Sequence, residues 1–238
     1  MRLDVALVER GLARSRTHAA TLIAEGRVAV NGATTTKASA RIGTDDELTA
    51  RAELWVSRAA HKLLGALAGS GVDIRGRVLD AGASTGGFTQ VCLERGADVV
   101  YAVDVGHDQL APELRADPRV RVREGLNLRD LTLDDLDGLP VDRVVGDVSF
   151  ISLRLLLPAL WSVLRDDGEA LLLVKPQFEV GRERLGSGGV VRDERLRAEA
   201  VDAVVADAEA LGWRQRWRGV SELPGATGNV EYFVHLTR

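Results

Sequence analysis

Short apolar runs that alternate with helical patterns fill the chain from residue 76 onward. Five of these runs occupy residues 78–79, 99–103, 120–122, 141–145 and 170–174. Parallel strands are buried on both faces and need a long crossover between them, which a helix usually provides. The pattern therefore predicts an α/β fold around a mostly parallel sheet. Residues 213–220 and 230–236 are expected to close that sheet as an antiparallel hairpin, because the second run is rich in β-formers.

The first fifty residues follow a different pattern. Residues 3–10 and 16–24 are predicted to be short helices that end at Gly11 and Gly26. We predict a strand at residues 28–30, a tight turn at Asn31 and Gly32, and a returning strand at residues 34–36. We therefore expect a small α+β domain at 1–50, a linker at 51–58 and a second domain at 59–238. Ser57 is expected to cap a helix over residues 58–68.

Charge is unevenly distributed, although the net charge of the 238 residues is only −4. That net value argues against indiscriminate nucleic-acid binding. Residues 1–43, however, contain seven Lys or Arg and three Asp or Glu, so the positive surplus lies in the first domain. A single cysteine, Cys92, excludes an internal disulfide framework and cannot form a zinc site alone. The sequence thus predicts a cytoplasmic protein without a metal, and no apolar run reaches the ~18 residues of a membrane span.

A glycine-rich turn lies between the first predicted strand of the second domain and the helix that follows it. The segment LDAGASTGGFT contains Gly82 and Gly86, and the next predicted strand ends at Asp104. Glycines let a ligand approach the backbone, and a carboxylate after the second strand can accept hydrogen bonds from ribose hydroxyls. The spacing is neither a dinucleotide fingerprint nor a phosphate-binding loop, so S-adenosylmethionine, which has no phosphate, fits better. The alternative is an ordinary strand–helix turn.

Two charged residues end later strands of the predicted sheet. Asp147 follows the run at 141–145, and Lys175 ends the run at 170–174. Ligands of open α/β sheets bind at the carboxyl ends of the strands, so both side chains are expected to face the methyl donor. Asp147 could instead cap a helix before Ile151, and Lys175 could be a solvated strand end.

Together with Lys62 and Glu231, these residues resemble the Lys-Asp-Lys-Glu tetrad of the ribose 2′-O-methyltransferases related to FtsJ. The strings VSRAAHKL, GDVSFIS, LLVKPQFEVGRERLGSGGVVRD and GATGNVEYF resemble one branch more closely, the TlyA family, whose members were first called hemolysins. The resemblance spans nearly the whole chain. It implies a Rossmann-like class I methyltransferase fold with a seven-stranded, mostly parallel sheet covered by helices on both faces. It also implies methylation of a cytidine ribose in ribosomal RNA, with the large subunit favoured over the small.

The segment LVERGLARSRTHAATLIAEGRVAVNG resembles the S4 RNA-binding domain of that family. The resemblance agrees with the helix, helix and hairpin pattern of residues 1–50. We expect RNA phosphates to be contacted by one set of residues: Arg2, Arg14, Ser15, Arg16, Arg27 and Lys37. Any one of these arginines could instead belong to an ordinary solvated face.

The resemblance also assigns roles in the second domain. The expected cofactor-binding residues are Gly82, Ala83, Ser84, Gly86, Gly87, Phe88, Asp104, Asn127 and Asp147. Asn127 is expected near adenine together with residues 124–126, but it could instead cap a helix that begins near Arg129. Lys175 is the expected catalytic base, helped by the neighbouring cation of Lys62; alternatively it stays charged and steers the hydroxyl. Asp147 and Glu231 are expected to orient the two lysines.

Three other functions are alternatives for a chain with this pattern. A non-catalytic RNA-binding protein could keep the fold, but all four tetrad positions are present. A membrane-active cytolysin would need an amphipathic or spanning segment, and the expected helices are short and of mixed charge. Methylation of a base carbon often uses a cysteine nucleophile, and Cys92 is poorly placed within the helix predicted after the glycine-rich turn. The sequence leaves the nucleotide and the oligomeric state open.

Overall fold

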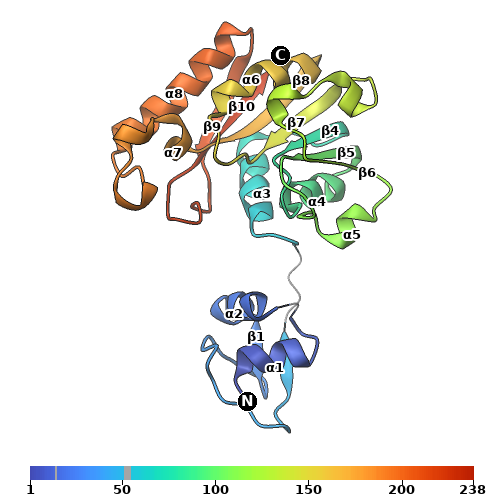
Figure 1. Cartoon of the computed structure of the whole chain (residues 1–238), viewed down its shortest axis with the longest axis vertical. Coiled ribbons are helices and arrows are strands. Elements are labelled where there is room, and N and C mark those ends of the chain that lie inside the picture. The colour runs from blue at the N-terminus through green and yellow to red at the C-terminus, as the bar shows by residue number, and fades with distance from the viewer. Residues whose placement is uncertain (14, 51–54) are drawn as a thin grey trace. The chain divides into compact units, whose positions relative to one another are not determined.

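The computed structural model describes residues 1–13, 15–50 and 55–238. The chain divides into two compact units, Met1–Leu54 and Trp55–Arg238, and each is described here by itself (Figure 1). The predicted linker 51–58 includes residues 51–54, which lie outside the described residues. Of its remaining four residues, Val56 is buried in the core of the second unit.

The first unit packs two helices on a small antiparallel sheet. The helices are α1 (Leu3–Glu9) and α2 (Arg16–Ala24), and the strands are β1 (Val28–Val30), β2 (Ala33–Thr34) and β3 (Leu48–Ala50), in the order β2-β1-β3. Gly11 and Gly26 follow the helices with φ of 70° and 68°, the left-handed conformation that ends a helix. The returning strand is shorter than predicted. The third strand was not predicted at all, because three residues carry too little pattern to mark a strand.

The second unit contains a seven-stranded sheet in the order β6-β5-β4-β7-β8-β10-β9. Its strands are β4 (Gly76–Ala81), β5 (Ala97–Asp104), β6 (Val120–Glu124), β7 (Val141–Gly146), β8 (Leu164–Val174), β9 (Arg214–Val220) and β10 (Tyr232–Thr237). The first five are parallel, and β10 pairs antiparallel with both β8 and β9. The predicted α/β class, the parallel sheet and the antiparallel closing hairpin are confirmed.

Helices cover both faces of this sheet (Figure 1). They are α3 (Ala59–Ser70), α4 (Gly87–Glu94), α5 (Pro112–Arg115), α6 (Leu157–Val163), α7 (Pro176–Glu179) and α8 (Glu194–Ala210), with 3₁₀ turns η1 (Leu128–Asp130), η2 (Leu133–Leu136), η3 (Leu153–Leu155), η4 (Arg182–Arg184) and η5 (Ser187–Gly189). Successive strand residues point to opposite faces. Val78 and Val100 accordingly pack with α3 and α4, whereas Leu79 and Tyr101 pack with α6 and α8.

One local prediction needs correction. The helix expected over 58–68 spans Ala59–Ser70, and its N-cap is Arg58, which makes no side-chain capping bond. Ser57 lies one residue earlier, and its hydroxyl accepts a hydrogen bond from the Ala59 amide at 3.2 Å. The difference is one residue at the start of the helix, within the range over which helix ends vary.

Candidate active site

The glycine-rich turn joins β4 to α4 at the carboxyl edge of the sheet. Gly82 and Gly86 have φ of 85° and 98°, which only glycine adopts without strain. A Cβ at Gly82 would lie 3.1 Å from the carbonyl oxygen of Asp147, and one at Gly86 would lie 2.4 Å from a methyl carbon of Leu114. A larger residue at either position would collide with these neighbours and displace the turn. The turn therefore presents bare backbone to the adjoining cavities.

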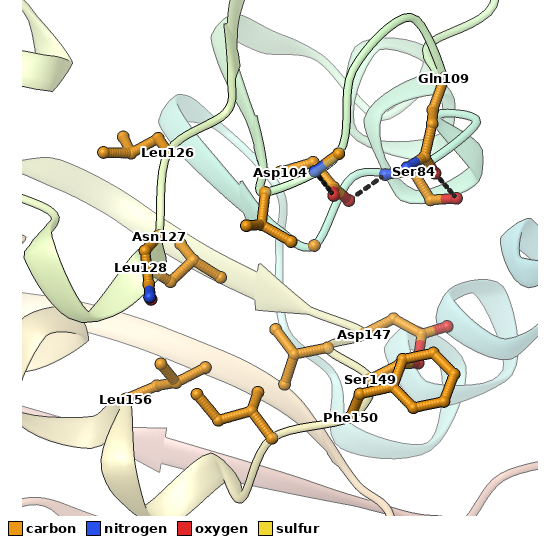
Figure 2. Close-up of a pocket in the computed structure, with 15 residues that line it drawn as sticks. Ser84, Asp104, Gln109, Leu126, Asn127, Leu128, Asp147, Ser149, Phe150 and Leu156 are labelled. Carbon is orange, nitrogen blue, oxygen red and sulfur yellow. Dashed lines mark hydrogen bonds between the residues drawn. The ribbon is translucent and has the colours of Figure 1, made fainter.

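Asp104 ends β5 beside this turn, as predicted. Its Oδ2 accepts a hydrogen bond from the Ser84 amide and its Oδ1 accepts one from the Gly106 amide, both at 2.8 Å (Figure 2). The Ser84 hydroxyl in turn donates to Oε1 of Gln109 at 3.1 Å. Each carboxylate oxygen of Asp104 keeps a lone pair for a further donor. The carboxylate is thus held in one orientation and remains able to accept ligand hydroxyls.

A cavity of about 460 Å³, here called the nucleoside cavity, lies next to Asp104. Its walls are mostly apolar and include Val105, Leu126, Leu128, Val148, Ile151 and Leu156 (Figure 2). Val105 is 69% exposed although it is apolar and directly follows the carboxylate. Such a surface suits the face of a flat heterocycle, because covering it removes apolar area from water.

Asn127 lines the nucleoside cavity, but its side chain has a structural task as well. Its Oδ1 accepts a hydrogen bond from the Arg129 amide at 3.0 Å and so caps η1. Asn127 therefore caps a helical turn, as the alternative interpretation of this residue predicted. Glu124, at the start of the segment expected near adenine, forms an ion pair with Arg115 at 2.6 Å and does not line the nucleoside cavity. Leu126, from the same segment, does line it.

Asp80 lies two residues before Gly82 and is fully buried. Its Oδ2 accepts a hydrogen bond from the Thr89 hydroxyl at 2.6 Å, whereas Oδ1 has no partner among the described residues. Burial raises the pKa of this carboxyl from 3.8 to about 7, and the bonds from Thr89 only partly oppose that effect. Asp80 ties the start of α4 to the end of β4, which fixes the turn between them.

This pKa predicts a pH dependence of stability. Between pH 3.8 and about 7 the folded chain keeps a proton on Asp80 that the unfolded chain has lost, so the free energy of unfolding falls as pH rises and levels off above 7. Asp80→Asn removes the titrating carboxyl and with it this pH dependence of the free energy of unfolding. The stability difference between variant and wild type is expected to shift in favour of the variant by on the order of 3 kcal/mol from about pH 5 to about pH 8.

Urea unfolding followed by tryptophan fluorescence measures this difference, because all four tryptophans lie in the second unit. Asp98→Asn, which alters an exposed carboxylate on β5, is the matched control and should follow the wild-type profile. Parallel profiles for wild type and Asp80→Asn would show that the buried carboxyl is ionised throughout.

Four charged side chains from distant segments converge at the carboxyl edge. Lys62 Nζ lies 2.6 Å from Oε2 of Glu231 and 3.8 Å from Oδ2 of Asp147. Lys175 Nζ lies 2.5 Å from the other Asp147 oxygen and donates to the Ser149 hydroxyl at 2.7 Å. Lys62, Lys175 and Glu231 are all buried. The structure thus brings the four tetrad residues into one network, with Asp147 between the two lysines.

The capping alternative for Asp147 is not realised. The next helical turn, η3, begins at Leu153 with Ser152 as its N-cap, and Asp147 contacts the lysines instead. Lys175 is not a solvated strand end either, since only 8% of its surface is exposed. The charged groups of both residues therefore make their contacts inside the site.

Two more cavities meet at this network. One of about 160 Å³ is lined by the turn residues Ala83, Ser84, Thr85, Gly87 and Phe88 together with Asp147 and Lys175. The other, about 430 Å³ and here called the acceptor cavity, is lined by the whole tetrad and by Arg58, Phe150, Gln177 and Thr227, among others. Asp147 and Ser149 line all three cavities. A molecule in the nucleoside cavity and one in the acceptor cavity would therefore meet beside Asp147.

Several residues around the acceptor cavity were not singled out from the sequence. Phe150 has a φ of 65°, is 92% exposed, and lies 5.4 Å from Phe178 between ring centroids. Gln177 donates from Nε2 to Glu231 at 3.1 Å. Neither Phe150 nor Gln177 belongs to a periodic pattern in the sequence. For Phe150 there was one signal: it is an aromatic residue that closely follows the end of a strand, where ligands bind.

Two further side chains hold the loops around this cavity. Asn229 is buried; it accepts from the Val191 amide at 3.0 Å and donates to the Gly189 carbonyl at 3.1 Å. Glu179 accepts from the Ser152 hydroxyl at 2.6 Å and from the Leu153 amide at 2.7 Å, and burial raises its pKa. The glycine-rich segment after α7 is thus tied to the segment before β10, and both line the acceptor cavity.

In the first unit, Arg2 and Arg16 converge on Asp4. Arg2 Nε lies 2.9 Å from Oδ1 of Asp4, and Arg16 Nη2 lies 3.2 Å from Oδ2. The hydrogen bonds from Arg2 are the main cause that lowers the pKa of Asp4 to about 2. Both guanidinium groups are exposed, so this carboxylate holds them side by side at the surface.

The other residues of the predicted RNA-binding set are more dispersed. The Ser15 hydroxyl caps α2 by accepting from the His18 amide at 3.2 Å, and Arg27 pairs with Glu25 at 2.8 Å. Lys37 is exposed. Arg14 lies outside the described residues.

Cys92 is fully buried within α4, and burial raises the pKa of its thiol. A buried thiol of that kind is a poor nucleophile. In the described part of the chain, no group of three or more His, Cys, Asp or Glu could hold a metal ion. Within the same residues, every helix is too short or too polar to cross a lipid bilayer.

Comparison with known proteins agrees with this geometry. The family model of the FtsJ-like methyltransferases matches residues 55–238, and the S4 domain model matches residues 1–48. The 16S/23S rRNA (cytidine-2′-O)-methyltransferase TlyA of Mycobacterium tuberculosis is 51% identical, over 99% of this chain and 89% of its own length. The 23S rRNA (cytidine-2′-O)-methyltransferase TlyA of Campylobacter jejuni is 36% identical, over 78% of this chain and 72% of its own.

A solved structure from Streptococcus thermophilus that carries the name hemolysin superposes with a TM-score of 0.79 at 40% identity, and the match covers 100% of this chain and 88% of that one. Likeness of this extent covers both units, the glycine-rich turn and all four tetrad positions. The chain therefore belongs to the FtsJ-like methyltransferase family and, by its S4 domain and its similarity along the whole length, to the TlyA branch of that family.

Proposed function

We propose that this methyltransferase moves the methyl group of S-adenosylmethionine to the 2′-oxygen of a cytidine in ribosomal RNA. The observation that carries the proposal is the position of the tetrad, which lies between a nucleoside-sized cavity and a separate acceptor cavity. The names of the two TlyA relatives describe them as methyltransferases of cytidine 2′-oxygens in ribosomal RNA.

The nucleoside cavity fits S-adenosylmethionine better than a phosphorylated cofactor. Its lining in the described residues includes no Lys or Arg that could bind a phosphate, and Asp104 would repel one. Asp104 would instead accept hydrogen bonds from both ribose hydroxyls, while Val105 and Leu128 cover the adenine. The methionine end would lie along the turn, at Gly82, Ala83, Ser84, Gly86, Gly87 and Phe88. Asp147 would face the positive sulfonium, and Asn127 would border the adenine.

When bound, S-adenosylmethionine supplies an electrophilic methyl group. Lys175 would hold the acceptor 2′-oxygen: its ammonium has three donors, one of which bonds to Ser149, and its ion pair with Asp147 still leaves a donor for the ribose. Lys62 and Glu231 would keep Asp147 in place from the other side, because Lys62 contacts both carboxylates. Removal of the hydroxyl proton falls to Lys175 if it enters the reaction neutral; otherwise its role is orientation alone.

The first unit would supply RNA affinity. The domain boundaries proposed from the sequence, 1–50, 51–58 and 59–238, place the division between the compact units, after residue 54, inside the linker. Arg2 and Arg16, held by Asp4, would contact phosphates, and so would the other members of the set: Arg14, Ser15, Arg27 and Lys37. Of the two ribosomal subunits, the large one is favoured because both named TlyA relatives act on 23S rRNA.

Transfer of labelled methyl from S-adenosylmethionine to separated, unmodified ribosomal subunits tests the proposal. Label is expected on the large subunit at one 2′-oxygen, mapped by reverse-transcription stops at low nucleotide concentration. Label on the small subunit as well would match the wider range named for the Mycobacterium tuberculosis relative. Binding of both ligands without any transfer would favour the non-catalytic RNA-binding alternative, and label on a base would refute ribose methylation.

A further inference from the structure

A further groove of about 360 Å³, here called the flanking groove, adjoins the acceptor cavity. It is lined by Phe150, Ile151, Ser152, Gln177, Phe178, Gly181 and Leu185. Four of these residues, Phe150, Gln177, Phe178 and Leu185, line the acceptor cavity too. No tetrad residue lines the flanking groove, and neither does any residue of the glycine-rich turn. The groove is therefore continuous with the acceptor site and contains no catalytic residue; it shares Phe150 and Ile151 with the nucleoside cavity.

The walls of the flanking groove are aromatic and aliphatic. The rings of Phe150 and Phe178 are inclined at 49°, so they do not stack flat on one another and their faces stay available. Phe150 is 92% exposed and has a left-handed backbone, a costly conformation for a bulky residue that core packing does not explain. Unstacked bases of single-stranded RNA bind on such aromatic faces, and any of the four bases can do so.

The occupant follows from this continuity and from the charge nearby. Nucleotides next to each other in RNA share one phosphodiester, so the neighbour of an acceptor nucleotide must lie in a hollow that adjoins the acceptor cavity. Arg58 is exposed on the wall of that cavity, where a guanidinium can contact the connecting phosphate. Among the side chains that the structure describes, none that lines the groove is charged, which suits the face of a base better than a phosphate or an acidic peptide.

We propose that the flanking groove binds the nucleobase directly next to the methylated nucleotide, with Phe178 as the stacking surface and Ile151 and Leu185 as apolar walls. The enzyme then separates two consecutive bases from their stack, one for each hollow. This inference rests on the proposed function, because it presupposes a ribose acceptor beside the tetrad. Its consequence is that affinity for RNA depends on a residue that touches neither the acceptor oxygen nor the cofactor.

The first test is kinetic and uses the full chain with unmodified large subunits. Phe178→Leu is expected to raise KM for the subunits about tenfold, the effect of one lost base–aromatic stack, with kcat and the Kd for S-adenosylmethionine within about twofold of wild type. Phe178→Tyr keeps an aromatic face and should restore KM. Leu155→Ala, at an exposed apolar residue outside the groove, is the control and should leave KM unchanged. An unaltered KM in Phe178→Leu, or no rescue by Phe178→Tyr, overturns the proposal.

The second test identifies the occupant. The chain carrying Leu185→p-benzoylphenylalanine is irradiated on the same subunits, and the crosslinked nucleotide is mapped by reverse transcription. A crosslink to the nucleotide directly 5′ or 3′ of the methylated one is expected. A crosslink to a second copy of the chain, to a ribosomal protein or to a distant nucleotide contradicts the proposal. Absence of methyl transfer by the wild-type chain, measured beforehand, would instead refute the proposed function.

Discussion

Lys175→Met is expected to reduce methyl transfer to ribosomal subunits by at least about 10³-fold. Methionine keeps most of the length of the side chain and removes the ammonium, which pairs with Asp147 and donates to Ser149. Lys175 lines only the small cavity at the methionine end and not the nucleoside cavity, so the Kd for S-adenosylmethionine is expected to change far less than the rate, by less than about tenfold. Single-turnover transfer and calorimetric titration of the cofactor measure the two quantities.

Lys175→Arg separates the two roles that remain for this lysine. Arginine stays protonated in proteins, so it can steer a hydroxyl but cannot accept its proton. An inactive Lys175→Arg variant is expected if Lys175 is the base, and residual transfer well above that of Lys175→Met is expected if it only orients the hydroxyl. Arg75→Gln removes an exposed charge that lines none of the three cavities and serves as the control. Full activity in Lys175→Met would exclude this residue from the chemistry.

Glu231→Gln is expected to lower the free energy of unfolding of the second unit by about 3 kcal/mol. The variant keeps the shape of the side chain but leaves the buried ammonium of Lys62 with only Asp147, 3.8 Å away, as a counter-charge. A buried charge that loses its partner is costly, whereas a neutral pair of similar size is not. Lys62→Met combined with Glu231→Gln should therefore be less destabilised than Glu231→Gln alone, by about 2 kcal/mol.

Urea unfolding followed by tryptophan fluorescence measures this cycle, because the signal arises only from the second unit. The separation of 2.6 Å between Lys62 Nζ and Glu231 Oε2 predicts that the two residues are energetically coupled. Additive effects of the two substitutions would contradict this prediction. Glu222→Gln, at an exposed carboxylate outside the tetrad, is the comparison variant and should leave the free energy of unfolding nearly unchanged.

Much of the fold was predictable because it is encoded locally. The alternation of apolar runs and helical patterns set the sheet, and glycine requirements marked the turn after β4. Asp104, Asp147 and Lys175 could be placed at the site from the sequence because each directly follows or ends a strand, and parallel strands end at one edge. Capping residues were less predictable. Asn127 serves its 3₁₀ turn and borders the nucleoside cavity at once, which no local pattern reveals.

The sequence by itself determined the fold class, the two-part organisation, the position of the cofactor turn and, through family resemblance, the tetrad. Only the tertiary structure decided what lies in contact: Lys62 and Glu231 are 169 positions apart and meet because α3 packs on the sheet to which β10, directly after Glu231, belongs. The convergence of Arg2 and Arg16 on Asp4 and the continuity of the flanking groove with the acceptor cavity arise in the same way. The physical reason is that periodicity and turn chemistry act over a few residues, whereas a site is built from side chains that packing brings together across the whole chain.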